Sequence, residues 1–184
     1  MLKKIAIVGP ESTGKSTLCE QLADHYHSLW CPEYAREYLS EHGMEYSYDD
    51  LLIIAEGQIA LEEKYLQLAT GEGQRPNQGV YPLFIDTDMY VMKVWCDFVF
   101  GKCHQYILDK ILDQQYDLYL LCNVDILWIP DELREYPDLE TRKKLYKIYL
   151  DIMINQTVPW TAISGNTEER LEKAIAAVEV ILKK

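Results

Sequence analysis

Residues 5–16 read Ile-Ala-Ile-Val-Gly-Pro-Glu-Ser-Thr-Gly-Lys-Ser. An apolar strand thus leads directly into a loop of the pattern G-x-x-x-x-G-K-[ST], and helix-forming residues 17–26 follow the loop. Gly9 and Gly14 allow backbone turns that a Cβ would obstruct, so that successive N–H groups can converge on phosphate oxygens. Strand, loop and helix together predict a binding site for the phosphates of a nucleoside triphosphate.

The side chains of this phosphate loop, residues 9–16, have distinct expected roles. Lys15 is placed to reach the β- and γ-phosphates, and the hydroxyl of Ser16 is placed to hold Mg²⁺. The positive end of the helix that begins here adds to the same anion site. The residues expected to contact the nucleotide are Gly9, Glu11, Ser12, Thr13, Gly14, Lys15, Ser16 and Thr17.

The composition is that of an ordinary globular chain, with 184 residues, 48% apolar and 26% charged. A net charge of −12 argues against a nucleic-acid partner, because duplex binding requires a basic face. No apolar run reaches the roughly 18 residues of a membrane span, and charged residues and the phosphate loop follow the N-terminus at once. We therefore expect a cytoplasmic protein that contacts neither nucleic acid nor membrane.

The cysteines and histidines give no sign of a structural metal or a disulfide framework. The five cysteines are odd in number and include no C-x-x-C pair, and the four histidines lack metal-ligand spacing. The expected partner is a small molecule. Whether the chain forms a homo-oligomer is left open by the sequence.

Apolar, β-branched runs alternate with longer helical patterns, which is typical of a parallel sheet covered by helices on both faces. We expect one α/β domain over residues 1–184 with a doubly wound, five-stranded parallel sheet. The expected strands lie near 3–8, 29–32, 82–86, 117–122 and 160–164. The expected helices lie near 15–26, from 33 onward, and near 48–68, 88–100, 104–114, 138–155 and 167–183, with a surface loop at 71–80.

The third strand ends in the acidic run Asp86-Thr87-Asp88. Ligands of open parallel sheets gather at the carboxyl ends of the strands, so this run is expected beside the phosphate loop. Asp86 is expected to hold Mg²⁺, directly or through water, next to Ser16. For Asp88 two roles stay open: to accept the proton of a substrate hydroxyl, or to cap the helix that follows.

The second strand leads to Glu33 and Arg36 at the same edge. The Glu33 carboxylate can serve as general base or bind a sugar diol, or it can simply favour the start of a helix. Arg36, about one turn later, can orient the acceptor by reaching a phosphate or a carbonyl. Trp95, on the helix after the acidic run, can stack on an aromatic substrate or belong to the core.

Residues 126–142 are expected to form a lid. Phosphoryl transfer spreads negative charge over the moving group, and a lid that places Arg134 and Arg142 over this group would stabilise the charge and exclude water. The alternative is that these arginines lie on a solvated helical face. At the end of the fifth strand, Asn166 and Glu169 have the spacing of a capping box.

Together these motifs resemble the ribosylnicotinamide kinase domain of the bacterial NadR-type proteins, which belong to the P-loop kinase-like ATPases. The resemblance covers nearly the whole chain. It is carried by Gly-Pro-Glu-Ser-Thr-Gly-Lys-Ser-Thr-Leu (9–18), Glu-Tyr-Ala-Arg-Glu-Tyr (33–38), Phe-Ile-Asp-Thr-Asp (84–88), Asp-Leu-Tyr-Leu-Leu-Cys (117–122), Asp-Ile (125–126) and Asp-Glu-Leu-Arg (131–134).

The resemblance implies ATP- and Mg²⁺-dependent phosphorylation of the 5′-hydroxyl of nicotinamide riboside, which gives nicotinamide mononucleotide. A kinase for another nucleoside or small acceptor is the first alternative, and a regulatory ATPase switch is the second. The absence of an Asn-Lys-x-Asp motif disfavours a GTPase. The expected catalytic residues are Lys15, Glu33, Asp88, Arg134 and Arg142, and the expected acceptor-site residues are Glu33, Arg36, Asp86 and Trp95.

Overall fold

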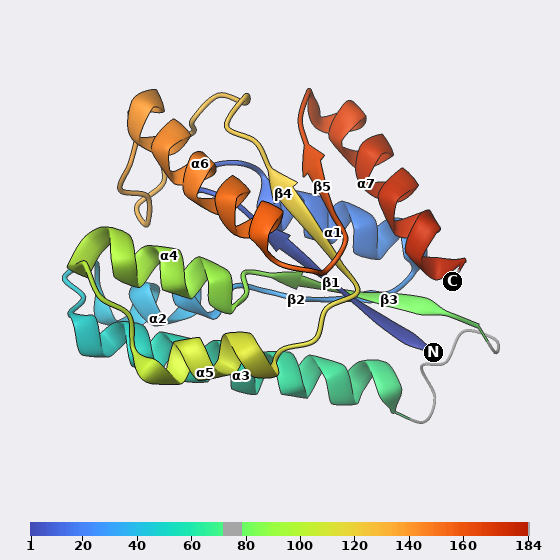
Figure 1. Ribbon diagram of the computed structural model, residues 1–184, viewed down its shortest axis with the longest axis horizontal. Helices are drawn as coiled ribbons and strands as arrows, with labels where there is room; N and C mark the ends of the chain where they lie inside the picture. Colours follow the sequence, from blue (N-terminus) through green and yellow to red (C-terminus); the bar gives the residue numbers. More distant parts are fainter. Residues whose placement is uncertain (72–78, 184) are drawn as a thin grey trace.

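The computed structural model describes residues 1–71 and 79–183, so most of the loop expected at 71–80 lies outside the described residues. The described strands form one parallel sheet in the order β2-β3-β1-β4-β5 (Figure 1). The strands are β1 (Leu2–Val8), β2 (Leu29–Cys31), β3 (Tyr81–Asp86), β4 (Leu118–Cys122) and β5 (Trp160–Ile163).

The helices follow the expected positions within about two residues. They are α1 (Lys15–Tyr26), α2 (Tyr34–His42), α3 (Tyr48–Thr70), α4 (Met89–Phe100), α5 (Gln105–Asp113), α6 (Leu139–Asn155) and α7 (Thr167–Leu182). The Asn166–Glu169 capping box is present at the start of α7, as the sequence predicts. Within the described residues no helix is long and apolar enough to cross a membrane.

Helices cover both faces of the sheet because successive strand residues point to opposite sides. Ile5 and Ile7 of β1 pack with α1 and α7, whereas Ala6 and Val8 pack with α4 and α6. A third buried cluster joins α2, α3, α4 and α5 beside the sheet. The expected doubly wound α/β class is therefore confirmed.

The strand order positions the site. The chain runs from β1 to the edge strand β2, returns to β3 beside β1, and then crosses to β4 and β5 on the other side of β1. The carboxyl end of β1 thus lies where the order of the strands reverses, which is where open α/β sheets bind their ligands. The phosphate loop leaves β1 at this point (Figure 1).

Candidate active site

A cavity of about 400 Å³ opens at the carboxyl edge of the sheet, around the phosphate loop. Most side chains that the sequence singles out lie in its wall: residues 9–17, Glu33, Arg36, Asp86, Trp95 and Arg134. Asp88 and Arg142 do not belong to the wall of this cavity in the described part of the chain. The fold thus brings most of the predicted site together from segments far apart in the sequence.

The phosphate loop has the backbone conformation that its glycines predict. Gly9 and Gly14 have φ values of 137° and 75°. A Cβ on Gly9 would lie only 2.7 Å from the backbone oxygen of Cys122, so this close approach requires glycine. Lys15 begins α1, and its Nζ donates a hydrogen bond of 3.1 Å to the carbonyl oxygen of Pro10. The ammonium group therefore lies at the loop, where phosphates are expected.

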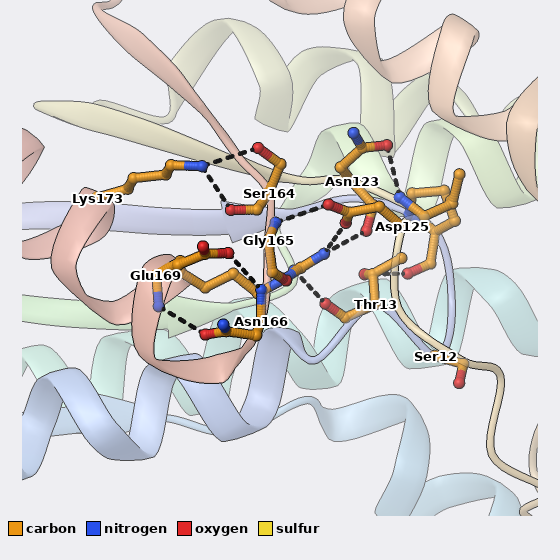
Figure 2. A network of polar contacts seen from close by, with 12 residues as sticks. Ser12, Thr13, Asn123, Asp125, Ser164, Gly165, Asn166, Glu169 and Lys173 are labelled. Atoms are coloured by element: carbon orange, nitrogen blue, oxygen red, sulfur yellow. Dashed lines mark hydrogen bonds and ion pairs between the residues drawn. The ribbon is translucent and has the colours of Figure 1, made fainter.

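Arg170 of α7 holds this loop from behind. Its guanidinium donates to the carbonyl oxygens of Thr13, Asn123 and Gly165, each at 2.9 Å. It also pairs with Asp125, whose other oxygen accepts a hydrogen bond from the N–H of Gly165 at 2.7 Å. Figure 2 shows Thr13, Asn123, Asp125 and Gly165 gathered in this network. One buried cation thus ties together the loops that follow β1, β4 and β5.

No motif predicts this role of Arg170, although the sequence contains one signal for it. Arg170 lies near the N-terminus of α7, directly after Glu168 and Glu169. The positive end of a helix favours acidic residues and disfavours a cation. A buried arginine at this position therefore needs specific acceptors, and the carbonyl oxygens at the strand ends supply them.

The prediction for Arg142 is corrected by the structure. Arg142 lies in α6 with only 2% of its surface exposed, and it donates a hydrogen bond of 3.0 Å to the carbonyl oxygen of Ser12. It is neither a lid residue over the cavity nor part of a solvated helical face. Its position is that of a second support behind the phosphate loop.

Asp86 ends β3 with the properties expected of a metal ligand. It is 1% exposed, and neither carboxylate oxygen has a hydrogen-bond partner among the described residues. Burial and the nearby charge of Glu33 raise the pKa of Asp86 to about 6, although the charge of Lys15 opposes the rise. A buried carboxylate that has no direct hydrogen bond but lies close enough to the Ser16 hydroxyl for this group to lower its pKa fits a divalent cation.

Asp88, two residues later, contacts the start of α4 and is not among the described residues that line the cavity. Its carboxylate accepts hydrogen bonds from the N–H of Val91 at 3.1 Å and from Nε2 of Gln114 at 3.2 Å, and it caps α4. Thr87 between the two acids has a φ of 78°, an uncommon conformation for a residue with a branched side chain. Of the two roles left open for Asp88, the structure shows the helix cap, and Asp88 is not among the described residues that line the cavity.

The wall of the cavity also contains aromatic and apolar side chains. Trp95 lies in it, and its Nε1 donates to the hydroxyl of Tyr46 at 2.9 Å. No sequence motif predicts several further members of this wall, because they come from four separate segments of the chain. These residues are Trp30, Val94, Phe98, Leu133, Tyr136 and Tyr149. Such a wall suits a flat ring more than a polyol.

Glu33 and Arg36 also lie in the wall of the cavity. Glu33 precedes α2, but its side chain does not cap this helix; one carboxylate oxygen instead accepts a hydrogen bond from the hydroxyl of Thr87 at 3.2 Å. Arg36 pairs with Asp131 at 3.1 Å, and half of its side chain is exposed. Both side chains therefore lie near Asp86, and the charge of each affects the pKa of its carboxyl group.

The β4–α6 connection, residues 123–138, covers part of the phosphate loop. The N–H of Ile129 donates to the hydroxyl of Ser12 at 3.1 Å, and the Glu11 carboxylate accepts hydrogen bonds from this connection. A carboxylate offers a phosphate no hydrogen-bond donor, so the expected nucleotide contact of Glu11 is left to its backbone N–H. Arg134 lines the cavity and donates to the carbonyl oxygen of Ile129.

Comparison with known proteins agrees with this description. The chain is 25% identical over 98% of its length to the trifunctional NAD biosynthesis/regulator protein NadR of Escherichia coli (strain K12). It is 26% identical over 88% of its length to the protein of the same name from Salmonella typhimurium. It spans 42% and 38% of these two relatives, about two fifths of their length.

Solved structures of NadR proteins have the same fold. A crystal structure of NadR protein in complex with NR gives a TM-score of 0.77 at 21% identity, and one in complex with NAD and AMP-PNP gives 0.71 at 23% identity. Each covers 99% of this chain, which spans 50% of the other. The resemblance to NadR-type proteins is thereby confirmed. Because a family model described as AAA domain matches residues 4–170, nearly the whole chain, the protein belongs to this family and has the fold of a P-loop NTPase.

Proposed function

We propose that this chain is an ATP- and Mg²⁺-dependent kinase that phosphorylates a hydroxyl group of a small nucleoside, with nicotinamide riboside as the first candidate. One observation carries the proposal. A single cavity joins a phosphate-binding loop and a buried carboxylate without a direct hydrogen bond to aromatic side chains, and Glu33 and Arg36 lie in the same wall. Together these groups supply what a triphosphate, a metal ion, a reacting hydroxyl and an aromatic base require.

Each residue has a role in the proposed reaction. The backbone N–H groups of Gly9 and residues 11–14 and the Lys15 ammonium would bind the phosphates, and Ser16 with Asp86 would hold the metal. When bound, Mg²⁺ neutralises charge on the β- and γ-phosphate oxygens. Arg134 lies near enough to the loop to add positive charge beside the transferring group.

Glu33 is the proposed proton acceptor. The acceptor hydroxyl oxygen forms a bond to the γ-phosphorus, and the bond from this phosphorus to the bridging β–γ oxygen breaks. ADP leaves with that bridging oxygen, and the hydroxyl proton passes to the Glu33 carboxylate. Arg36 and Trp95 would orient the acceptor so that its hydroxyl points toward the phosphate.

The comparisons support the substrate class. One NadR structure contains NR, nicotinamide riboside, and another contains the ATP analogue AMP-PNP. Because this chain spans about half of those chains, their ligands support the proposal without extending it to their other activities. Another nucleoside is the alternative acceptor on the same site.

The test is an acceptor panel with purified chain, ATP and Mg²⁺. Nicotinamide riboside, nicotinic acid riboside and the common ribonucleosides are supplied singly, and ADP and phosphorylated nucleoside are both quantified. We expect ADP to form in proportion to a phosphorylated product, fastest with nicotinamide riboside. Equal and slow ADP release with and without every acceptor would instead indicate a regulatory ATPase and contradict the proposal.

A pair of variants tests the assignment of Glu33. Glu33→Gln should lower kcat by about a hundredfold or more, the usual contribution of a general base. Glu37→Gln makes the same change of charge on the exposed part of α2 and should leave kcat unchanged. Equal kcat values for the two variants would contradict the assignment of Glu33 as the proton acceptor.

A further inference from the structure

The Glu11 carboxylate binds the β4–α6 connection, although Glu11 belongs to the phosphate loop and lines the cavity. Its Oε1 accepts hydrogen bonds from the N–H of Tyr136 at 2.6 Å and from Nε1 of Trp128 at 3.3 Å. Its Oε2 accepts one from the N–H of Glu135 at 2.9 Å. A single carboxylate thus binds three donors of the β4–α6 connection, more than 110 residues further along the chain.

The bound segment forms part of the wall of the cavity. Leu133, Arg134, Glu135 and Tyr136 all line this cavity. The Glu135 carboxylate accepts a hydrogen bond from the Tyr46 hydroxyl at 2.8 Å, and this hydroxyl accepts one from Nε1 of Trp95 at 2.9 Å. A continuous set of contacts therefore leads from the phosphate loop to the aromatic wall.

The charge of Glu11 is unfavourable for nucleotide binding taken alone. A carboxylate beside a polyphosphate site repels the ligand, and it has no proton to donate to a phosphate oxygen. Hydrogen bonds from N–H groups to a carboxylate are, in contrast, among the stronger ones in proteins. The carboxylate is therefore suited to hold the wall and not to bind the nucleotide.

We propose that Glu11 is a positioning residue for the acceptor: its carboxylate fixes the wall formed by residues 133–136 against the phosphate loop. This proposal rests on the proposed kinase function. It requires that the loss of the Glu11 charge weakens acceptor binding and leaves ATP binding equal or tighter. A residue that merely stabilised the loop would alter both affinities in the same direction.

The test compares Glu11→Gln with the control Glu132→Gln. Glutamine keeps the shape of the side chain, but its NH₂ group cannot accept the hydrogen bonds that one carboxylate oxygen now accepts. Glu132 lies in the same segment, is exposed, and makes no hydrogen bond through its carboxylate in the described part of the chain. The control therefore removes the same charge from the same region without touching the contact.

We expect the KM for the acceptor to rise about tenfold or more in Glu11→Gln, as for the loss of a hydrogen bond to a charged group. The KM for ATP should stay within about twofold or fall, since a repulsive charge is removed. Glu132→Gln should match the unaltered chain. An unchanged acceptor KM in Glu11→Gln, or an equal rise in both KM values, would overturn the proposal.

Hydrogen exchange supplies a measurement that does not depend on activity. In Glu11→Gln the amides of residues 128–136 should exchange faster than in the unaltered chain, while those of β1 and β4 should not. Unchanged exchange in this segment would overturn the positioning role. If no acceptor in the panel is phosphorylated by the unaltered chain, the proposed function fails, and the exchange result still decides whether Glu11 holds the wall.

A second variant covers the case that Glu11→Gln does not fold. Tyr46→Phe removes the hydroxyl between Glu135 and Trp95 at the far end of the same contacts and leaves the phosphate loop intact. It should also raise the KM for the acceptor without raising that for ATP. An acceptor KM equal to that of the unaltered chain would contradict a role for these contacts in positioning the acceptor.

Discussion

Arg170 makes hydrogen bonds to backbone carbonyls of three separate loops, and it is nearly inaccessible, with 6% of its side chain exposed. Arg170→Met should lower the free energy of unfolding by about 3 kcal/mol or more, because buried carbonyl oxygens lose their partners. Lys173→Met is the control: Lys173 lies one turn later in α7 and donates to Ser164, but it is exposed. Urea unfolding gives the free energy of unfolding of both variants. Similar losses in the two would show that the buried network contributes little to stability.

Asp86 should show the opposite effect on stability. Its carboxylate is buried without a hydrogen-bond partner in the described chain, so its charge destabilises the metal-free fold. Asp86→Asn should therefore raise the free energy of unfolding in EDTA at neutral pH by about 1–3 kcal/mol, the cost of ionising a buried carboxyl group whose pKa is raised to about 6.

The same substitution should remove Mg²⁺-dependent turnover, because an amide is a much poorer ligand for this cation. Asn and Asp have nearly equal volumes, so the substitution leaves the packing at the end of β3 unchanged. No separate control for packing is needed. A destabilised Asp86→Asn variant, or one with unchanged kinetics in Mg²⁺, would place the metal elsewhere.

The sequence predicts site residues whose role follows from a local pattern. Lys15, Ser16 and Asp86 can be predicted because the loop motif and the acidic strand end that indicate their roles each lie within a few residues. Arg142 and Arg170 cannot be placed in the same way, because most of their partners are backbone carbonyl oxygens. Every residue type has such a group, so no sequence pattern marks the acceptor, and only the folded chain brings the pair together.

At the scale of helices and strands, local signals again determine what can be predicted. The bounds of the strands and helices follow from apolar periodicity and from caps such as the Asn166–Glu169 pair. The class of sheet was predicted correctly for the same reason. The order β2-β3-β1-β4-β5 depends on which strands pair across 40 or more residues, and no single segment specifies that choice.

The contact between α2 and α3 depends on a glycine in the middle of a helix. A Cβ on Gly57 would lie 2.0 Å from a ring carbon of Tyr34, so the ring packs where a side chain would be. Gly57→Ala should improve helix propensity by about 1 kcal/mol. It should nevertheless destabilise the protein by about 1–3 kcal/mol in total, because the tyrosine ring must move.

A double-mutant cycle separates the two effects of Gly57→Ala. In a Tyr34→Ala background the clash is absent, and the same substitution should stabilise the protein by about 0.5–1 kcal/mol, since only the propensity term is left. Thermal or urea unfolding of the four proteins gives the comparison. If Gly57→Ala destabilises the protein equally in both backgrounds, the clash with the Tyr34 ring is not the cause of the destabilisation.

For the whole molecule, a net charge of −12 constrains how an anion can bind. Even the cavity has more carboxylates than cations in its wall, with Glu11, Glu33, Asp86, Asp131 and Glu135 against Lys15, Arg36 and Arg134. ATP adds further negative charge to this place. Binding should therefore depend strongly on a divalent cation, and free ATP should bind far more weakly than its Mg²⁺ complex.

Thermal unfolding tests this dependence on the intact chain. MgATP at a hundredfold excess over its Kd should raise Tm by about 5–10 °C, the shift expected for a ligand that binds only the folded state of a domain of this size. ATP in EDTA should give little shift. Lys15→Ala should keep the Tm of the unliganded protein and lose the MgATP shift, whereas Lys143→Ala, an exposed change of the same charge on α6, should retain it. A full shift in Lys15→Ala, or equal shifts with and without Mg²⁺, would mean that the triphosphate does not bind at the end of β1.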